Sequence, residues 1–471
     1  MAADNYPKLG IILPPTRRGL GMIKSFPLDV SHLLAWLREK QSLCVELIDY
    51  RIHSINRDNY WGDRGVDAGV YSNFPLCVDY LLRREDPTVK WNSLRIIKDI
   101  RPARFDYIFF SVSVLEQFSL EYLMAALCLA KEIRLLFPRI RIVIFGSCPK
   151  KHIKCILQNF DFIDAFLEDG CELSVGPYVA GAAAGEPLNG FSYRQNGKII
   201  YAPGKRTDVP FNEFPVPDFS LFKKEDYMCG GALVLPYEII RGCSENCFYC
   251  YFTHKNSLSY KTVERVVGDL KKLSGEYGTN AFHFVDGAMN SDLEYLRELC
   301  DAMKAELPQI RWSAMARPVM SYEDIRAMKD AGCVHIRWGV EYGSERMLNK
   351  IKKGTSLKTI KKTLQDAHGL GIYNYITLLT NTEVENDGDI EETKRFIREV
   401  RPFIDSAHEC VFRELGSFDL AKLVRLLEPA APPADDKKPK YQSLFKELGI
   451  SRVDIIEAVA QRLDKAPAGR I

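Results

Sequence analysis

The sequence lacks any uncharged run that approaches the roughly 18 residues needed to span a bilayer. It also lacks an excess of either charge, because 64 Lys and Arg residues nearly balance 62 Asp and Glu residues and leave a formal net charge of +2. No global field draws this chain to nucleic acid or to a membrane surface, so neither partner is predicted. The opening residues, MAADNYPK, lack the basic and then apolar pattern of a secretory signal, and we expect a cytoplasmic protein.

Cysteine, in contrast, is abundant. Thirteen cysteines are many for a reducing compartment, and their odd number argues against a complete disulfide framework. Metal ligation or redox chemistry is therefore expected. The length of 471 residues and the ordinary share of apolar residues, 46%, predict a globular protein of two or three domains.

The first part of the chain alternates short apolar runs with amphipathic segments, which is the pattern of a parallel sheet covered by helices. It predicts an α/β, doubly wound, Rossmann-like domain over residues 1–175, with ligands beyond the carboxyl ends of its strands. Four residues stand at such ends and are candidate cofactor contacts, although residues of these types also serve turns. They are Ser111, Ser113, Gly146 and Ser147. The expected strands are 9–13, 44–49, 107–113, 141–145 and 164–167.

Residues 176–235 are predicted to be a connector, with a hairpin around 195–197 followed by a proline-rich run. The β/α alternation then resumes, and five or six units are too few for a closed barrel of eight. We therefore expect a partial (β/α)6 barrel over residues 236–410 and a small helical tail with a proline-rich linker over 411–471. The expected barrel strands are 237–241, 281–285, 311–316, 334–340 and 373–379.

Three cysteines follow the spacing C-x3-C-x2-C in the segment RGCSENCFYC. Cys243, Cys247 and Cys250 would bring three thiolates together around one soft metal centre. A closed zinc site needs four ligands, whereas a four-iron cluster held by three cysteines leaves one iron open. The alternatives are a zinc loop completed by His254, or three ordinary buried cysteines.

With Tyr249 before the last cysteine and a predicted strand before the loop, this segment resembles the signature of the radical S-adenosylmethionine (SAM) enzymes. Later segments match that family in the same order, and the motif PVPDF at 215–219 resembles a connector of its cobalamin-binding subgroup. The resemblance covers residues 8–400. The later segments are 284–290, 312–318 and 339–344.

This resemblance implies an enzyme that binds a [4Fe-4S] cluster, SAM and cobalamin. Such an enzyme cleaves SAM to a 5′-deoxyadenosyl radical, and the subgroup implies a methyltransferase acting on an unactivated carbon of a small-molecule or natural-product substrate. It also implies an external one-electron reductant of the flavodoxin or ferredoxin type. One alternative is a radical SAM cyclase, rearrangement or oxidation enzyme that lacks cobalamin or methyl transfer. Another is a zinc-binding module without catalysis.

The resemblance also assigns cofactor contacts to single residues, with Tyr249 placed in the cluster loop. Asp286 would accept a hydrogen bond from the SAM amino group, Arg317 would pair with a carboxylate, and Glu341 would bind ribose hydroxyls. The alternative for Asp286 is a helix cap, and the alternative for Arg317 and Glu341 is a salt-bridge network inside the barrel. No catalytic residue is predicted.

Two departures from the family pattern carry their own expectations. The motif Asp-x-His-x-x-Gly, which ligates cobalt in many cobalamin domains, is missing, because residues 14–19 read PPTRRG. We therefore expect cobalamin to bind without a protein histidine, and a vestigial domain is the alternative. The family's run Gly-Leu-Pro-x-Glu-Thr is replaced by TNTEVE at 380–385, which predicts an altered substrate pocket.

Overall fold

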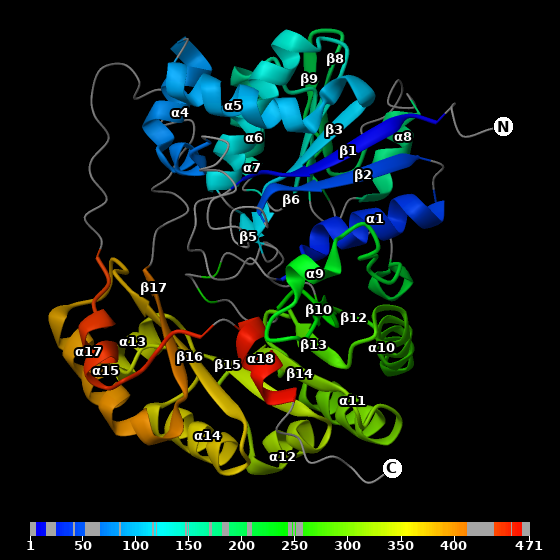
Figure 1. Cartoon of the computed structure of the whole chain (residues 1–471). Helices are drawn as coiled ribbons and strands as arrows, with labels where there is room; N and C mark the ends of the chain where they lie inside the picture. The colour runs from blue at the N-terminus through cyan, green and yellow to red at the C-terminus, as the bar shows by residue number, and fades with distance from the viewer. Residues whose placement is uncertain are drawn as a thin grey trace. The chain divides into compact units, whose positions relative to one another are not determined.

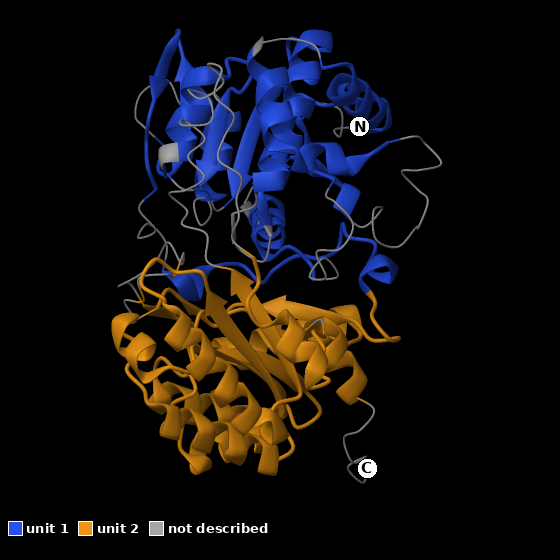
Figure 2. Cartoon of the chain, turned by 90° about the vertical axis from the view of Figure 1, so that its left-hand side faces the viewer, with its two compact units in different colours: residues 1–227, 418–433 blue, residues 228–417, 434–471 orange. Residues whose placement is uncertain are grey.

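The structure is a computed structural model, and its described residues fall into two compact units (Figure 2). The first unit lies within residues 1–227, and the second lies within 228–417 and 434–471. The structure describes residues 6–15, 25–40, 43–51, 66–83, 86–114, 117–118, 120–146, 148, 150–168, 172–180, 188–204, 210–243, 247, 250, 258–411, 438–453 and 455–463.

The first unit is built on a seven-stranded sheet with the order β2-β1-β3-β6-β7-β8-β9 (Figure 1). The strands from β2 to β7 run parallel, and the apolar runs of β1, β3, β6 and β7 are buried because helices cover the sheet, whereas the edge strand β2 is only partly buried. The order reverses direction between β1 and β3, so this edge is the expected ligand site of a doubly wound sheet. All five predicted strands are confirmed: β1 (Lys8–Leu13), β2 (Cys44–Asp49), β3 (Tyr107–Ser111), β6 (Arg141–Gly146) and β7 (Ala165–Glu168).

The predicted hairpin forms the last two strands of this sheet, β8 (Phe191–Gln195) and β9 (Lys198–Ile200). Its two-residue turn places Asn196 at φ +49° and Gly197 at φ +77°, as a type I′ turn requires. The strand β8 runs antiparallel to β7. The main helices of the unit are α1 (Leu28–Lys40), α4 (Phe74–Arg83), α5 (Pro87–Ile100), α6 (Leu120–Leu136), α7 (Lys150–Asn159) and α8 (Val175–Val179).

The second unit holds a six-stranded parallel sheet with the order β10-β13-β14-β15-β16-β17. Its consecutive β/α units make the predicted partial barrel, in which the carboxyl ends of all six strands share one edge. The strands are β10 (Val234–Tyr237), β13 (Ala281–Phe284), β14 (Arg311–Ala316), β15 (Cys333–Glu341), β16 (Tyr373–Thr380) and β17 (Ser406–Val411). The helices between them are α10 (Val263–Tyr277), α11 (Leu293–Glu306), α12 (Tyr322–Asp330), α13 (Glu345–Lys350), α14 (Leu357–Gly369) and α15 (Asp387–Val400).

One predicted strand of this unit is wrong in its bounds. We expected a single strand over 237–241, but β10 ends at Tyr237, and β11 (Ile240–Arg241) pairs antiparallel with β12 (Ser259–Tyr260) in a separate two-stranded sheet. The strand ends here because the backbone N–H groups of Ile239 and Ile240 donate hydrogen bonds to the side chain of Asp286 and not to a neighbouring strand. The cysteine loop therefore follows β11.

The C-terminal helices α17 (Gln442–Glu447) and α18 (Ile455–Leu463) belong to the second unit. In α18, Ile456, Val459 and Ala460 form an apolar cluster with residues at the starts of three strands, Val234, Ala281 and Val334. This helix covers the amino-terminal end of the sheet and leaves the carboxyl ends for a site. No helix in the described part of the chain has the length and apolar character needed to cross a membrane.

Candidate active site

The cysteine loop begins directly after β11. Gly242 takes φ +99°, which favours glycine, and leads the chain into the loop. Cys243 and Cys247 are buried, Cys250 is half-buried, and the backbone N–H of Cys250 donates to the carbonyl of Cys247 at 3.2 Å. Among the described residues, no three His, Cys, Asp or Glu side chains are gathered closely enough to hold a metal ion. The roles of the three cysteines therefore stay predictions, and Tyr249 and His254 lie outside the described residues.

Asp286 anchors the backbone that leads into this loop. Its Oδ1 atom accepts hydrogen bonds from the backbone N–H groups of Ile239 at 2.8 Å and Ile240 at 2.5 Å. Its Oδ2 atom is buried without a hydrogen-bond partner, so an acceptor at a strand end is left for a ligand. The predicted alternative of a helix cap is wrong, because Asp292 caps α11 by accepting from the N–H groups of Glu294 and Tyr295.

Substitution of Asp286 by asparagine is expected to change how stability depends on pH. Burial raises the pKa of Asp286 to about 7, so between pH 4 and 7 the folded protein holds a proton that the unfolded chain has lost. Stability therefore falls as pH rises through that window. Asparagine removes the charge and keeps an oxygen for the two N–H groups. Its advantage should grow from near zero at pH 4 to at most about 4 kcal/mol above pH 7, by 1.36 kcal/mol per pKa unit.

Urea unfolding of the wild-type and Asp286→Asn proteins at pH 5 and pH 8 measures this trend. The control is Asp292→Asn, which replaces one good N-cap by another and should change stability little at either pH. An advantage of Asp286→Asn that stays the same at both pH values would contradict the assignment of a buried charge.

Arg317 and Glu341 meet at Lys353, beyond the ends of β14 and β15. A guanidinium nitrogen of Arg317 donates to the carbonyl of Lys353, and the Lys353 ammonium lies 3.1 Å from Glu341 Oε1. Glu341 stands at φ +65°, a strained conformation for a non-glycine residue, which turns its side chain back over the strand. A side chain on Gly339 would lie 2.8 Å from that carboxylate and 3.0 Å from the ammonium, so only glycine leaves room for the pair.

The structure thus brings Arg317 and Glu341 together through a third residue, Lys353, to which sequence analysis assigned no role. For Glu341 it shows the ion pair that we considered as the alternative. Asp286, Arg317 and Glu341 stand at the carboxyl ends of the neighbouring strands β13, β14 and β15. Their contacts with a cofactor stay predictions.

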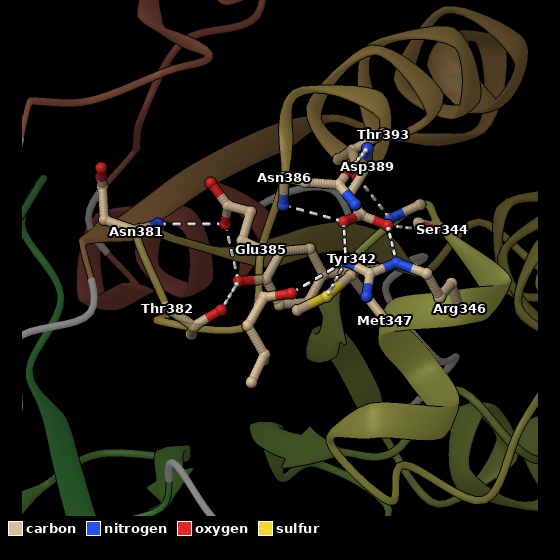
Figure 3. A network of polar contacts seen from close by, with 12 residues as sticks. Tyr342, Ser344, Arg346, Met347, Asn381, Thr382, Glu385, Asn386, Asp389 and Thr393 are labelled. Atoms are coloured by element: carbon tan, nitrogen blue, oxygen red, sulfur yellow. Dashed lines mark hydrogen bonds and ion pairs between the residues drawn. The ribbon is translucent and has the colours of Figure 1, made fainter.

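The replaced family segment at 380–385 is part of a polar network beyond the ends of β15 and β16 (Figure 3). Glu385 Oε2 accepts hydrogen bonds from the Tyr342 hydroxyl at 2.8 Å and from the backbone N–H of Asn381 at 3.0 Å. The hydroxyl groups of Tyr342 and Thr382 lie 2.8 Å apart. Burial raises the pKa of Glu385, so these donors hold a partly desolvated carboxyl. Residues 380–385 are thus held by hydrogen bonds to Tyr342 and to one another. Their expected effect on a substrate pocket stays a prediction.

At the switch point of the first unit, the structure brings together three of the four predicted residues. Gly146 takes φ +119°, and a Cβ there would lie 2.2 Å from the Ser113 hydroxyl. The Ser111 hydroxyl donates to Asp29 Oδ2 at 3.3 Å, and all these side chains are buried. Ser147 lies outside the described residues, as do residues 16–19 of the segment that lacks the cobalt-ligating histidine.

A second buried cluster at the end of β2 was missed by sequence reasoning. Arg51 binds Asp49 in a bidentate pair, with N to O distances of 3.1 and 2.9 Å, and donates to the Tyr227 hydroxyl at 3.2 Å. Burial would raise the pKa of Asp49, but the attraction and hydrogen bonds of Arg51 outweigh it and lower that pKa. The Tyr227 ring stacks on Phe26 at 4.0 Å between centroids. This cluster lies at the carboxyl end of β2, on the same edge of the sheet as Ser111 and Gly146.

Comparison with known proteins identifies the second unit. Residues 237–397 match the family model described as the Radical SAM superfamily. The second unit is a radical SAM domain. The predicted resemblance is confirmed, and the zinc module is not favoured. A radical SAM domain implies a [4Fe-4S] cluster and SAM as cofactors.

Two curated relatives of this chain carry methyltransferase names. The chain is 26% identical over 247 residues to an uncharacterized methyltransferase of Pyrococcus horikoshii, across 50% of this chain and 53% of that protein. It is 26% identical over 228 residues to cytidylyl-2-hydroxyethylphosphonate methyltransferase of Streptomyces wedmorensis, across 45% of this chain and 42% of that protein. The chain spans about half the length of the curated relatives it matches.

Two solved structures resemble the chain across both units. One is the cobalamin-dependent SAM radical enzyme OxsB with aqua-cobalamin and SAM bound, with a TM-score of 0.61 and 18% identity over 89% of this chain and 55% of that chain. The other is the radical SAM methyltransferase TsrM from Kitasatospora setae with cobalamin and a [4Fe-4S] cluster bound, with a TM-score of 0.58 and 12% identity over 86% of this chain and 75% of that chain. These likenesses confirm the predicted fold, a doubly wound domain followed by a radical SAM barrel.

The described residues fit the implied cofactors in their chemistry. Three thiols in one short segment supply soft ligands for iron and leave one coordination position open. The unpartnered Oδ2 atom of Asp286 suits a ligand that brings a hydrogen-bond donor. In the first unit, Gly146 has no Cβ at this strand end, which permits close approach of a ligand to the sheet edge.

Proposed function

We propose that this protein is a cobalamin-dependent radical SAM methyltransferase that modifies a carbon of a small-molecule substrate. The observation that carries the proposal is the likeness of the whole chain, through both units, to two cobalamin-dependent radical SAM enzymes. Methyltransferase names among the curated relatives support the same reaction. We propose that it works in the cytoplasm with an external one-electron carrier of the flavodoxin or ferredoxin type.

In this proposal, Cys243, Cys247 and Cys250 hold the [4Fe-4S] cluster. The bound cluster supplies one electron for cleavage of a carbon–sulfur bond of SAM, and bound cobalamin carries a methyl group. The residues of the chain bind and orient these groups and exclude water. Asp286 joins two of these tasks, because one carboxylate oxygen fixes the backbone before the loop and the other is left to accept a bond from the SAM ammonium.

The pair of Glu341 and Lys353 serves the ribose in this proposal. Lys353 is 3.1 Å from one carboxylate oxygen of Glu341, so the charge of that carboxylate is balanced while its second oxygen can accept from a hydroxyl. Arg317 fixes Lys353 by donating to its carbonyl. In the first unit, Ser111, Ser113 and Gly146 are proposed to line the cobalamin site, and Asp29 orients the hydroxyl of Ser111.

Methyl-deuterated SAM tests the reaction without knowledge of the substrate. Protein reconstituted anaerobically with iron, sulfide and cobalamin, and reduced with titanium citrate, should form S-adenosylhomocysteine in about the amount of bound cobalamin. The deuterated methyl group should be found in the corrinoid fraction by mass spectrometry. A second use of SAM at the cluster should release 5′-deoxyadenosine and methionine.

Protein reconstituted with the cluster alone is the control, and it should form 5′-deoxyadenosine without S-adenosylhomocysteine. If the cobalamin-loaded protein also forms only 5′-deoxyadenosine, the methyltransferase proposal is wrong. A radical SAM cyclase, rearrangement or oxidation enzyme would then be the better description.

A further inference from the structure

The inner face of the radical SAM barrel carries an arginine at mid-strand. Arg337 of β15 lies in register between Met315 of β14 and Tyr375 of β16. Its neighbour Trp338 faces outward, because the Trp338 indole donates to Asn374, whose amide donates to the carbonyl of Leu364 in α14. Side chains alternate along a strand, so Arg337 points to the interior. Its guanidinium lies 5.8 Å from the Tyr375 ring centroid.

No carboxylate balances this arginine within the described part of the chain. Arg337 is half-buried, and its Nε atom is buried without a hydrogen-bond partner. Glu341 is the carboxylate farther along the same strand, but its Oε1 atom is paired with Lys353. Burial of a guanidinium nitrogen without a partner is costly, so its retention indicates that an anion from outside completes the arginine.

The histidines around Arg337 are neutral. Burial, together with the repulsion of nearby arginines, lowers the pKa of His283 and of His408 to about 4 and that of His335 to about 3. His283 Nδ1 lies 2.7 Å from the Ser313 hydroxyl. Burial raises the pKa of the Cys410 thiol, although Arg337 opposes that rise. The histidines and the thiol around Arg337 are therefore neutral hydrogen-bonding groups, and Arg452 is a second positive charge near His408, Cys410 and Tyr375.

We propose that Arg337 binds an anionic group of the substrate, a carboxylate or a phosphate. This inference rests on the proposed function, because it assigns the substrate to the interior of the barrel. A guanidinium fork matches the two oxygens of either group and forms strong charge-assisted bonds with it. Arg337 lies four residues before Glu341 in β15, and its side chain interacts with the Cys410 thiol of β17.

Binding of inorganic phosphate and of acetate to the full-length protein tests the proposal at constant ionic strength. We expect saturable binding of one anion in calorimetric titrations. Arg337→Gln should weaken it at least about tenfold, and Arg337→Lys should weaken it less, because the charge remains but the fork is lost. The matched control is Arg326→Gln on the exposed face of α12, which should leave the affinity unchanged.

The affinities for phosphate and acetate show which of the two anionic groups Arg337 prefers. The affinity for SAM shows whether the arginine serves the cofactor or the substrate. The cluster-loaded Arg337→Gln protein should bind SAM within about twofold of wild type, because the SAM contacts that we propose lie at the strand ends. Loss of SAM affinity in step with phosphate affinity would assign the arginine to the cofactor and overturn the proposal. Absence of saturable anion binding by the wild-type protein would also overturn it.

A measurement on wild-type protein guards against misfolding of the variants. Phenylglyoxal modifies arginines, and phosphate should slow its reaction at Arg337 at least about fivefold, as mass spectrometry of peptides would show, because the bound anion covers the guanidinium. An unchanged rate at Arg337 would contradict the site. Neither measurement requires turnover, so failure of anion binding and failure of methyl transfer can be told apart.

Discussion

The Cys247→Ala protein is expected to lose its iron–sulfur cluster and all SAM cleavage. The second unit carries three cysteines at 243, 247 and 250, which we propose as the ligands of the cluster. Water cannot replace a thiolate ligand without a large loss of affinity. Iron and sulfide analysis after anaerobic reconstitution, with the visible absorption spectrum, measures the loss. The same result is expected for Cys243→Ala and Cys250→Ala.

Matched controls come from buried cysteines outside the loop. Cys300 lies on the packed face of α11, and burial raises the pKa of its thiol to about 12, so it is a protonated apolar side chain at neutral pH. Cys333 begins β15, is fully buried, and also has a raised pKa because of burial. Alanine at either position should leave the iron content unchanged. Full iron content and SAM cleavage in the Cys247→Ala protein would show that the loop does not hold the cluster.

Most of the strands that sequence patterns predicted have buried apolar runs, although β2 was also predicted and is only partly buried. The strands β1, β3 and β6 are continuous apolar runs because helices cover both sides of a parallel sheet. The strand β17 was missed, since its sequence, SAHECV, mixes polar residues into the run. These polar residues are explained by tertiary contacts: the Ser406 hydroxyl donates to the carbonyl of Ser451, and the Glu409 carboxylate accepts from the N–H of Tyr441. Such partners come from distant segments and leave no local signal.

Sequence analysis could choose candidate site residues where a residue type has a local meaning. Ser111, Ser113 and Gly146 were chosen because small residues at strand ends indicate close approach of a ligand or a turn, and their contact with a cofactor stays a prediction. Asp29 was missed, since an acidic residue in the first turn of a helix is explained by the helix dipole alone. Lys353 was missed as a partner, because the loop that brings it to Glu341 follows α13 and its path depends on packing.

Substitution of Gly146 by alanine is expected to destabilise the first unit by several kcal/mol and to abolish the cobalamin binding that we propose for it. The φ angle of +119° is essentially restricted to glycine, and forcing another residue there costs about 1–3 kcal/mol. A Cβ would also lie 2.2 Å from the Ser113 hydroxyl, closer than any stable contact, and such overpacking costs roughly 1–3 kcal/mol more. Thermal unfolding and cobalamin titration would measure both losses.

A control and a double variant separate the two causes. Gly197, in the hairpin of the same unit, has φ +77°, and no atom lies within 4 Å of the position that a Cβ would take. Gly197→Ala therefore carries backbone strain without a clash. It should cost about 1 kcal/mol and leave cobalamin affinity unchanged. The double variant Ser113→Ala and Gly146→Ala removes the clashing hydroxyl, and should recover the part of the stability that the contact had cost. If Gly146→Ala is no more harmful than Gly197→Ala, the Ser113 hydroxyl does not pack against this glycine. If its stability falls but cobalamin affinity is kept, the cofactor does not bind at this strand end, because the added methyl group would stand in its path.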